Sequence, residues 1–281
     1  MSDEKETVIA ISNNTNLHRA PQEIINEAND GRRTQDYIDD LVFAINQRQA
    51  AFLKNIIENY CIDSILDLSC GNGDLAVLLA GWDKDVTTLK QDPAQVDKVH
   101  LKSVLAGVHM TVSHGDIRDL SSIYKERFNL ITCFHNSLPR LVNEADIWGT
   151  LAQIYLRLEP GGVLLIQTLN YDYLLNENND ILPALKGYYG KLGINVSFNR
   201  GQDKSPAGLV FKALDNKGGR KKEKEVIVPV RPIFQRELNI WLAELGYERI
   251  ENYGVNKKNS KNLEPWEVIT LAFRPFSTGH D

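Results

Sequence analysis

An acidic residue and two glycines stand close together between two apolar runs of the chain. Asp67 lies four residues before Gly71, and Gly73 follows two positions later. Glycines here let the chain turn sharply without a Cβ, so a ligand can lie against the main chain near the first N–H groups of the next helix. This pattern predicts a site for a nucleotide-sized cofactor.

Two classes of cofactor fit this turn. Residues 71–76, Gly-Asn-Gly-Asp-Leu-Ala, match G-x-G-x-x-G/A, which binds the pyrophosphate of a dinucleotide. The Asp67 carboxylate would repel a pyrophosphate, whereas it would attract an ammonium group. The pattern therefore favours a zwitterionic cofactor, and an NAD-dependent dehydrogenase stays open as an alternative.

The elements that must position this turn alternate between short apolar segments and helical patterns. Such alternation predicts a parallel sheet covered on both faces, so we expect an α/β fold with a Rossmann-like, seven-stranded, mostly parallel sheet. The predicted strands begin at Ile65 and continue with 86–89, 108–112, 129–134, 163–168, 247–254 and 267–273, and the predicted helices include 36–60 and 234–245.

The alternation stops for about sixty residues in the second half of the chain. Segments 195–199, 208–214 and 225–230 look like antiparallel strands separated by glycine-rich and charged turns, of which the basic turn 215–222 reads as a solvated hairpin tip. We expect a polar N-terminal arm or cap over 1–35, a cofactor-binding α/β core over 36–172, an antiparallel lid insertion over 173–232, and the C-terminal part of the core over 233–281.

The composition excludes several classes of protein. The chain has 281 residues, 42% hydrophobic and 25% charged, with a net charge of −5, so no overall positive field favours nucleic acid. No segment approaches the roughly 18 apolar residues of a membrane span. The three cysteines form no C-x-x-C pair, which argues against a zinc site and a disulfide framework. We expect a cytoplasmic protein that binds neither metal, membrane nor nucleic acid.

Asp67, Gly71 and Gly73 fit the pattern D-x-x-x-G-x-G, and the stretch 65–80 around them resembles motif I of the class I S-adenosylmethionine-dependent methyltransferases. Residues 158–166, Leu-Glu-Pro-Gly-Gly-Val-Leu-Leu-Ile, are similar to the segment of that family in which a helix breaks and the fifth strand starts. The resemblance implies S-adenosylmethionine as the cofactor and S-adenosylhomocysteine as the product.

Two shorter motifs resemble one group within this family. Residues 133–138 contain Cys-x-x-Asn-Ser-Leu, and residues 169–175 read Leu-Asn-Tyr-Asp-Tyr-Leu-Leu; both look like the glycine N-methyltransferase group. The general resemblance covers roughly residues 45–172 and 234–274. Together the motifs imply a small-molecule acceptor that is methylated at nitrogen.

The resemblance assigns the cofactor contacts to three places. The turn after the first strand would surround the methionine part, the acid after the third strand would bind the adenine, and the exit of the fourth strand would pass behind the sulfonium. Arg48 would pair with the cofactor carboxylate or simply face solvent, and Asp116 could instead cap local N–H groups. The candidates are Asp67, Ser69, Cys70, Gly71, Asn72, Gly73, Arg48, Asp116, Ile117, Phe134 and His135.

Two positions depart from the family pattern. Lys90 stands where an acid usually binds the ribose hydroxyls, and a lysine cannot accept those protons, so Gln91 or Asp92 would have to take over. Leu169 stands where glycine N-methyltransferases carry an arginine that pairs with the substrate carboxylate. Free glycine is therefore a poor prediction for the acceptor.

Three polar residues are the candidates for the acceptor side. Asn136 follows the fourth strand and can donate and accept hydrogen bonds, so we predict that it contacts the acceptor. Tyr171 is the second candidate, and His135 is a candidate proton acceptor or a hydrogen-bonded wall residue. A degenerate protein that binds the cofactor without catalysis is an alternative, and a monomer and a homo-oligomer both stay open.

Overall fold

The computed structural model describes residues 45, 47–176, 187–189, 192–200, 207–215, 222–254 and 266–276. The arm predicted over 1–35 and the turn residues 216–221 lie outside these residues. Within the described part, no helix is long and apolar enough to cross a membrane.

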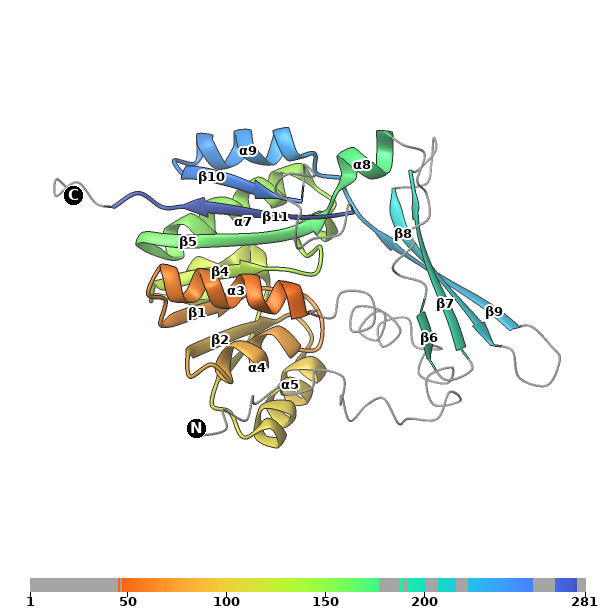
Figure 1. Cartoon of the computed structure of the whole chain (residues 1–281), viewed down its shortest axis with the longest axis horizontal. Helices are drawn as coiled ribbons and strands as arrows, with labels where there is room; N and C mark the ends of the chain where they lie inside the picture. Colours follow the sequence, from red (N-terminus) through yellow and green to blue (C-terminus); the bar gives the residue numbers. More distant parts are fainter. Residues whose placement is uncertain are drawn as a thin grey trace, which may run out of the picture.

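A seven-stranded sheet forms the centre of the molecule, in the order β10-β11-β5-β4-β1-β2-β3 (Figure 1). Strands β1 to β5 pair in parallel, and β11 runs antiparallel to both β5 and β10. This confirms the predicted mostly parallel sheet. The strands are β1 (Ser64–Asp67), β2 (Asp85–Lys90), β3 (Thr111–His114), β4 (Phe128–Cys133), β5 (Leu158–Leu169), β10 (Glu248–Tyr253) and β11 (Glu267–Phe273).

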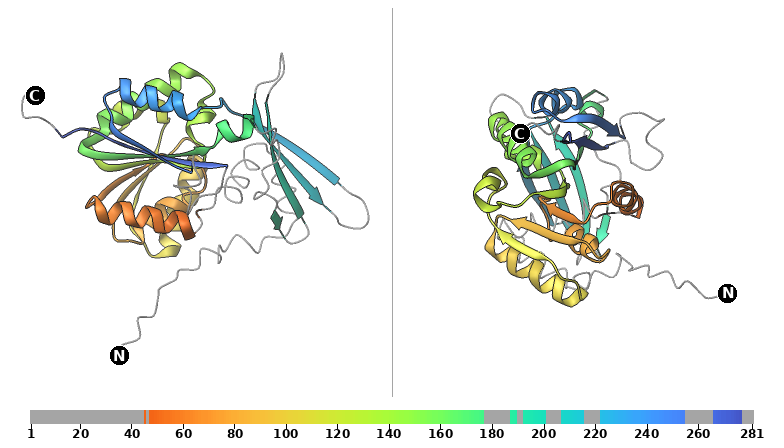
Figure 2. Two further views of the ribbon diagram at one scale, coloured as in Figure 1. Left: turned by 45° about the horizontal axis from the view of Figure 1, so that its top comes forward. Right: turned by 90° about the vertical axis from the view of Figure 1, so that its left-hand side faces the viewer.

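Helices cover both faces of this sheet (Figure 2). Neighbouring residues of a strand point to opposite faces, so Ile65 packs into the core with α3 and α4, whereas Leu66 packs into the core with α7 and α9. The helices are α3 (Gln47–Asn59), α4 (Asp74–Ala80) and α5 (Pro93–Ala106) on one face, and α6 (Leu120–Ile123), α7 (Glu144–Arg157) and α9 (Gln235–Glu244) on the other.

The order of the strands creates a switch point at the carboxyl edge of the sheet. Strand β1 pairs with β2 on one side and with β4 on the other, so the segments after β1 and β4 leave in different directions. Ligands of open α/β sheets bind in the crevice that forms at such a point. The short helices η2 (Ile117–Asp119), η3 (Leu138–Leu141) and α8 (Tyr171–Asn176) follow β3, β4 and β5 at this edge.

The prediction of the third strand over 108–112 was wrong, because β3 begins only at Thr111. Helix α5 ends in a left-handed Gly107, with φ of 67°, and the N–H of Val108 bonds back to the carbonyl of Ser103 at 3.1 Å. This is the Schellman arrangement, in which the residue after the glycine closes the helix end. Val108 therefore belongs to the cap and packs against the core from there.

The fifth strand starts earlier than predicted. Helix α7 ends at Arg157, and β5 begins directly at Leu158, which pairs with Phe128 of β4. The N–H of Gly161 donates to the carbonyl of Arg274 at 2.9 Å, which provides a main-chain partner for this glycine-rich segment. The ladder with β4 is irregular between Leu158 and Val163, and the glycines there exchange main-chain hydrogen bonds with Arg274 instead.

The predicted antiparallel insertion is present as a separate four-stranded sheet in the order β6-β7-β8-β9, which we call the lid sheet. It stands beyond the carboxyl edge of the central sheet (Figure 1), where the rings of Tyr171 and Phe198 lie 5.6 Å apart. Strand β6 escaped prediction because three residues are too short for an alternating pattern. The strands are β6 (Gly187–Tyr189), β7 (Leu192–Asn199), β8 (Gly208–Asp215) and β9 (Lys222–Pro229).

Candidate functional site

The turn after β1 is built from two left-handed glycines. Gly71 has φ of 103° and Gly73 has φ of 83°, conformations that side chains rarely adopt. A Cβ on Gly73 would lie 2.7 Å from the Cγ1 atom of Val99, so α5 can approach the turn only because this position is a glycine. The side-chain oxygen of Asn72 accepts from the N–H of Asp74 at 3.2 Å and supports the start of α4.

The Asp67 carboxylate lies fully buried beneath this turn. Its Oδ1 accepts from the N–H of Ser69 at 3.1 Å and the hydroxyl of Thr132 at 2.9 Å, and its Oδ2 accepts from the hydroxyl of Thr88 at 3.2 Å. The acid therefore ties β1 to β2, β4 and the turn. Its contact with a cofactor ammonium stays a prediction.

The turn is joined to the exit of β4 by reciprocal hydrogen bonds. The thiol of Cys70 donates to the carbonyl of His135 at 3.0 Å, and the imidazole Nδ1 of His135 lies 2.7 Å from the carbonyl of Cys70. The N–H of Cys70 donates to the hydroxyl of Ser137 at 2.7 Å, and the N–H of Phe134 donates to the hydroxyl of Ser69 at 2.9 Å. The structure thus brings the two predicted halves of the site together.

The partner of Nδ1 assigns the tautomer of His135. A carbonyl oxygen only accepts hydrogen bonds, so Nδ1 must carry a proton, and in the neutral imidazole Nε2 is then the acceptor nitrogen. The side chain is 7% exposed. The arrangement is that of a hydrogen-bonded wall residue whose remaining nitrogen has the chemistry of a base.

The backbone at the exit of β4 is strained. His135 has φ of 60° and Asn136 has φ of 57°, and a non-glycine residue in this region costs on the order of 1–3 kcal/mol. Gln167 of β5 holds both residues: its side-chain Oε1 accepts from the N–H of His135 at 2.7 Å, and its carbonyl accepts from the N–H of Asn136 at 3.3 Å. Sequence reasoning missed Gln167, although a polar residue within an apolar strand was a signal for it.

The side chain of Asn136 is fully buried behind this exit. Its Oδ1 accepts from the N–H of Leu169 at 3.1 Å, and its Nδ2 donates to the hydroxyl of Tyr171 at 2.8 Å. Burial raises the pKa of Tyr171 well above its ordinary value, so this hydroxyl stays protonated at neutral pH. The two acceptor-side candidates thus contact each other, and their contact with an acceptor stays a prediction. Phe134 is likewise fully buried in the core.

All three residues at the end of β2 already have partners within the protein. The ammonium of Lys90 is buried and donates to the carbonyl of Ser69 at 2.7 Å. The amide of Gln91 is exposed and donates to Asp116 at 2.8 Å. Asp92 caps α5 by accepting from the N–H of Ala94 at 2.9 Å, so turning back toward a ribose would cost this cap.

Asp116 caps the short helix η2, as the local reading of its sequence allows. Its carboxylate accepts from the main-chain N–H of Arg118 at 2.9 Å and from the guanidinium of the same residue at 2.7 Å. This guanidinium holds the pKa of Asp116 below its ordinary value. Ile117, beside it, packs partly buried against the core.

Helix α3 places one predicted residue and one missed residue near the same edge. Arg48 is exposed in the first turn, and its pairing with a cofactor carboxylate stays a prediction. The next residue, Gln49, is buried and donates to the Glu267 carboxylate at 3.0 Å. Glu267 begins β11 opposite Leu169 and was missed, although an acid at the head of an apolar strand is conspicuous.

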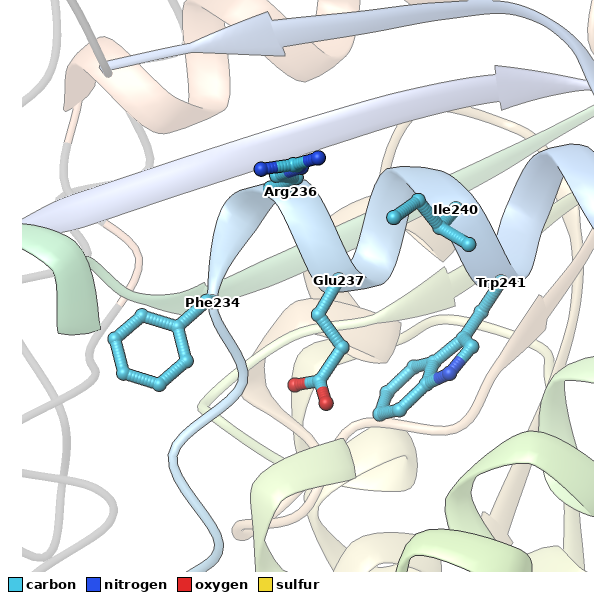
Figure 3. A pocket seen from close by; sticks show the side chains of 5 residues that line it. All are labelled: Phe234, Arg236, Glu237, Ile240 and Trp241. Carbon is cyan, nitrogen blue, oxygen red and sulfur yellow. The ribbon is translucent and has the colours of Figure 1, made fainter.

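A separate shallow pocket lies on α9. Phe234, Glu237 and Trp241 point to the same side of the helix there, and Arg236 and Ile240 complete its lining (Figure 3). None of the predicted site residues contributes to this pocket. Within the described part of the chain, no group of three or more His, Cys, Asp or Glu side chains could hold a metal ion.

The comparisons with known proteins agree with the geometry. A family described as a methyltransferase domain matches residues 65–162. A glycine/sarcosine N-methyltransferase from Halorhodospira halochloris is 29% identical over 213 residues, which cover 75% of this chain and 75% of that protein.

Solved structures share the fold. An S-adenosylmethionine-dependent methyltransferase from Clostridium acetobutylicum has a TM-score of 0.66 and 16% identity, covering 83% of this chain and 93% of the other. CalS10, an amino pentose methyltransferase from Micromonospora echinaspora solved with S-adenosylmethionine bound, has a TM-score of 0.59 and 16% identity, covering 80% and 90%. The comparisons lead to one conclusion: residues 65–162 match a methyltransferase domain, and the chain shares the fold of solved S-adenosylmethionine-dependent methyltransferases.

Proposed function

We propose that this chain transfers a methyl group from S-adenosylmethionine to a nitrogen atom of a small molecule. The observation that carries the proposal is the direct junction between the turn after β1 and the exit of β4, made by Cys70 and His135. This junction supports the proposal, because it joins the segment predicted to bind the cofactor to the segment that holds the candidate acceptor residues, at the switch point of the sheet.

The residues of the turn fit such a cofactor. Left-handed Gly71 and Gly73 let the main chain turn tightly after β1, and a buried acid, Asp67, supplies negative charge beneath a site for a cationic ligand. Main-chain groups of residues 69–73 would hold the methionine part, and residues 116–117 would lie beside the adenine. When bound, S-adenosylmethionine supplies an electrophilic methyl group on a sulfonium.

The protein's task in this reaction is placement and control of a proton. In-line alignment of two reactants can lower a barrier by about 7–11 kcal/mol. An amine attacks through its lone pair, so it must arrive neutral or lose its proton at the site. His135, with Nδ1 donating to Cys70, offers Nε2 as the atom that accepts this proton.

The acceptor differs from free glycine in our proposal. Relatives of this chain are named for glycine and sarcosine methylation, but Leu169 is an apolar side chain that is 1% exposed at the end of β5. It cannot form a charge-assisted bond to a substrate carboxylate. With a net charge of −5 the chain is also unsuited to a nucleic-acid acceptor, and we infer a cytoplasmic enzyme that acts on a small amine.

Calorimetric titration with S-adenosylmethionine and S-adenosylhomocysteine tests the cofactor, followed by mass spectrometry of candidate acceptors. The panel should contain glycine, sarcosine, amino sugars and uncharged amines, with phenols as oxygen acceptors. We expect both cofactor forms to bind. We also expect an amine other than glycine to gain about 14 Da for each hydrogen atom that a methyl group replaces. Failure of both forms to bind would refute the proposal, and methylation of phenols alone would assign oxygen instead of nitrogen.

The second candidate is a protein that binds the cofactor without catalysis. Lys90 in place of the ribose-binding acid and the engagement of Asp116 by Arg118 favour it. Binding of both cofactor forms without methyl transfer to any member of the panel would support this candidate.

A further inference from the structure

A buried cation lies at the end of β2, where the family resemblance implies an acid. The Lys90 side chain is 2% exposed, and its ammonium donates to the carbonyl of Ser69 at 2.7 Å. Among the residues that the structure describes, no carboxylate forms an ion pair with it. Because a buried ammonium is costly unless its charge is balanced, this lysine needs a physical explanation.

The main chain of Ser69 connects this cation to the buried acid. The N–H of Ser69 donates to Asp67 at 3.1 Å, and its carbonyl accepts from Lys90 at 2.7 Å. The two buried charges therefore have opposite signs, and they bind the main-chain N–H and the main-chain carbonyl of the same residue, Ser69. Hydrogen bonds to charged groups are stronger than neutral ones, so this pair fixes the first residue of the turn.

An acid at position 90 would act in the opposite way. A carboxylate offers only acceptor atoms, so it would face the Ser69 carbonyl with repulsion and add a second negative charge to the buried layer that holds Asp67. The backbone of the turn would lose one anchor. The anchor from position 90 to the Ser69 carbonyl thus depends on a side chain that can donate a hydrogen bond.

We propose that Lys90 is a positioning residue, which balances Asp67 through Ser69 and holds the turn in the shape that binds the cofactor. This inference rests on the proposed function for its binding readout. It predicts that restoring an acid at position 90 weakens cofactor binding, whereas a ribose-binding role for this position predicts stronger binding.

The first experiment compares Lys90→Glu, Lys90→Met and Lys90→Arg by calorimetric titration with S-adenosylmethionine. We expect the affinity to fall at least about tenfold in Lys90→Glu and Lys90→Met and less in Lys90→Arg, which keeps the charge. The control is Lys84→Met, because Lys84 pairs with Asp63 at the opposite edge of the same strand pair, at 3.1 Å, and should leave the affinity unchanged. Equal or tighter binding by Lys90→Glu, or by Lys90→Met if the first variant does not fold, would overturn the proposal.

The second experiment measures unfolding free energies of Asp67→Asn, Lys90→Met and the double variant. We expect the double variant to be more stable than the sum of the single losses predicts, because each single change leaves one buried charge without its counterpart. Additive losses would overturn the proposal. This cycle needs no ligand, so it still decides the role of Lys90 if the wild-type protein binds neither cofactor form and the proposed function fails.

Discussion

At the scale of single residues, the chemistry of this site depends on how the protein anchors each candidate group. The imidazole of His135 is fixed through Nδ1 by the carbonyl of Cys70, and the same residue is fixed through its main chain by Gln167. A side chain anchored in this way has its second nitrogen set at a defined position. Anchoring and proton acceptance can therefore be separated by substitution.

His135→Asn tests that separation. The asparagine amide can replace the Nδ1 donor and tolerates the φ of 60°, but it has no basic nitrogen. If Nε2 accepts the proton, kcat at neutral pH should fall by about 10²-fold while the affinity for S-adenosylmethionine stays within a few fold. His135→Ala serves as the comparison, since it also removes the anchor and should weaken cofactor binding. An unchanged kcat in His135→Asn would make this residue a wall residue only.

The Asp116–Arg118 pair predicts a pH dependence of stability. Arg118 lowers the pKa of Asp116 in the folded state, so the pair stabilises the fold above the unfolded pKa of about 3.9 and loses this effect as the pH falls through the lower folded value. Arg118→Gln should lower the unfolding midpoint by about 2 °C at pH 7, and the difference should vanish near pH 2–3. Thermal unfolding across this range measures it, and a difference that grows on acidification would contradict it.

At the scale of elements, the packing of α5 against the turn after β1 restricts which residue can stand at position 73. Position 73 needs glycine for two reasons. Its φ is 83°, and the Val99 side chain of α5 lies where a Cβ would stand. A left-handed glycine elsewhere, Gly107 at the end of α5, has nothing within 4 Å of its would-be Cβ. The two glycines therefore separate the effect of backbone strain from that of crowding.

Gly73→Ala should destabilise the protein by about 2–4 kcal/mol, against about 1–2 kcal/mol for Gly107→Ala. Both variants strain the backbone, but only the first meets Val99. Gly73→Ala should cost less stability in a protein that already carries Val99→Ala than in the wild type, because the shortened side chain no longer meets the new Cβ. Denaturant unfolding measures the series, and equal losses in both glycine variants would show that the contact with α5 carries no energy.

At the scale of the whole molecule, the lid sheet contacts the core beside Tyr171, a candidate acceptor-side residue. The ring of Phe198 packs edge-on against Tyr171, and the guanidinium of Arg200 donates to the carbonyl of Leu174 at 3.2 Å. Tyr171 also bonds to Asn136 at the exit of β4. These contacts connect the lid sheet to the exit of β4 through Tyr171.

Phe198→Leu should raise the KM for the acceptor several-fold while leaving the affinity for S-adenosylmethionine unchanged. The substitution removes a ring contact of about 0.5–1.5 kcal/mol and keeps an apolar side chain. Phe52→Leu is the control, because Phe52 makes a similar edge contact with Tyr253 at 5.0 Å within the core. Equal effects of both variants on the acceptor KM would show that the contact of the lid sheet has no special role.

The sequence by itself determined the class of fold and the location of the glycine turn after β1. The alternation of short apolar segments with helical patterns predicted a parallel sheet covered on both faces, and the acid and glycines of 67–73 marked the turn, because these are properties of neighbouring residues. Strand limits were less accurate: the cap at Gly107 moved the start of β3 to Thr111. Such limits depend on hydrogen bonds that composition does not reveal.

Only the tertiary structure decided which of the predicted residues act on each other. Lys90 appeared as a missing acid in the sequence, but the pairing of β2 with β1 brings its ammonium to the carbonyl of Ser69, whose N–H donates to Asp67. Gln167 gained its role because β5 lies beside the exit of β4. These partners are far apart in the chain, and the free energy of a buried charge or amide depends on the partner it meets.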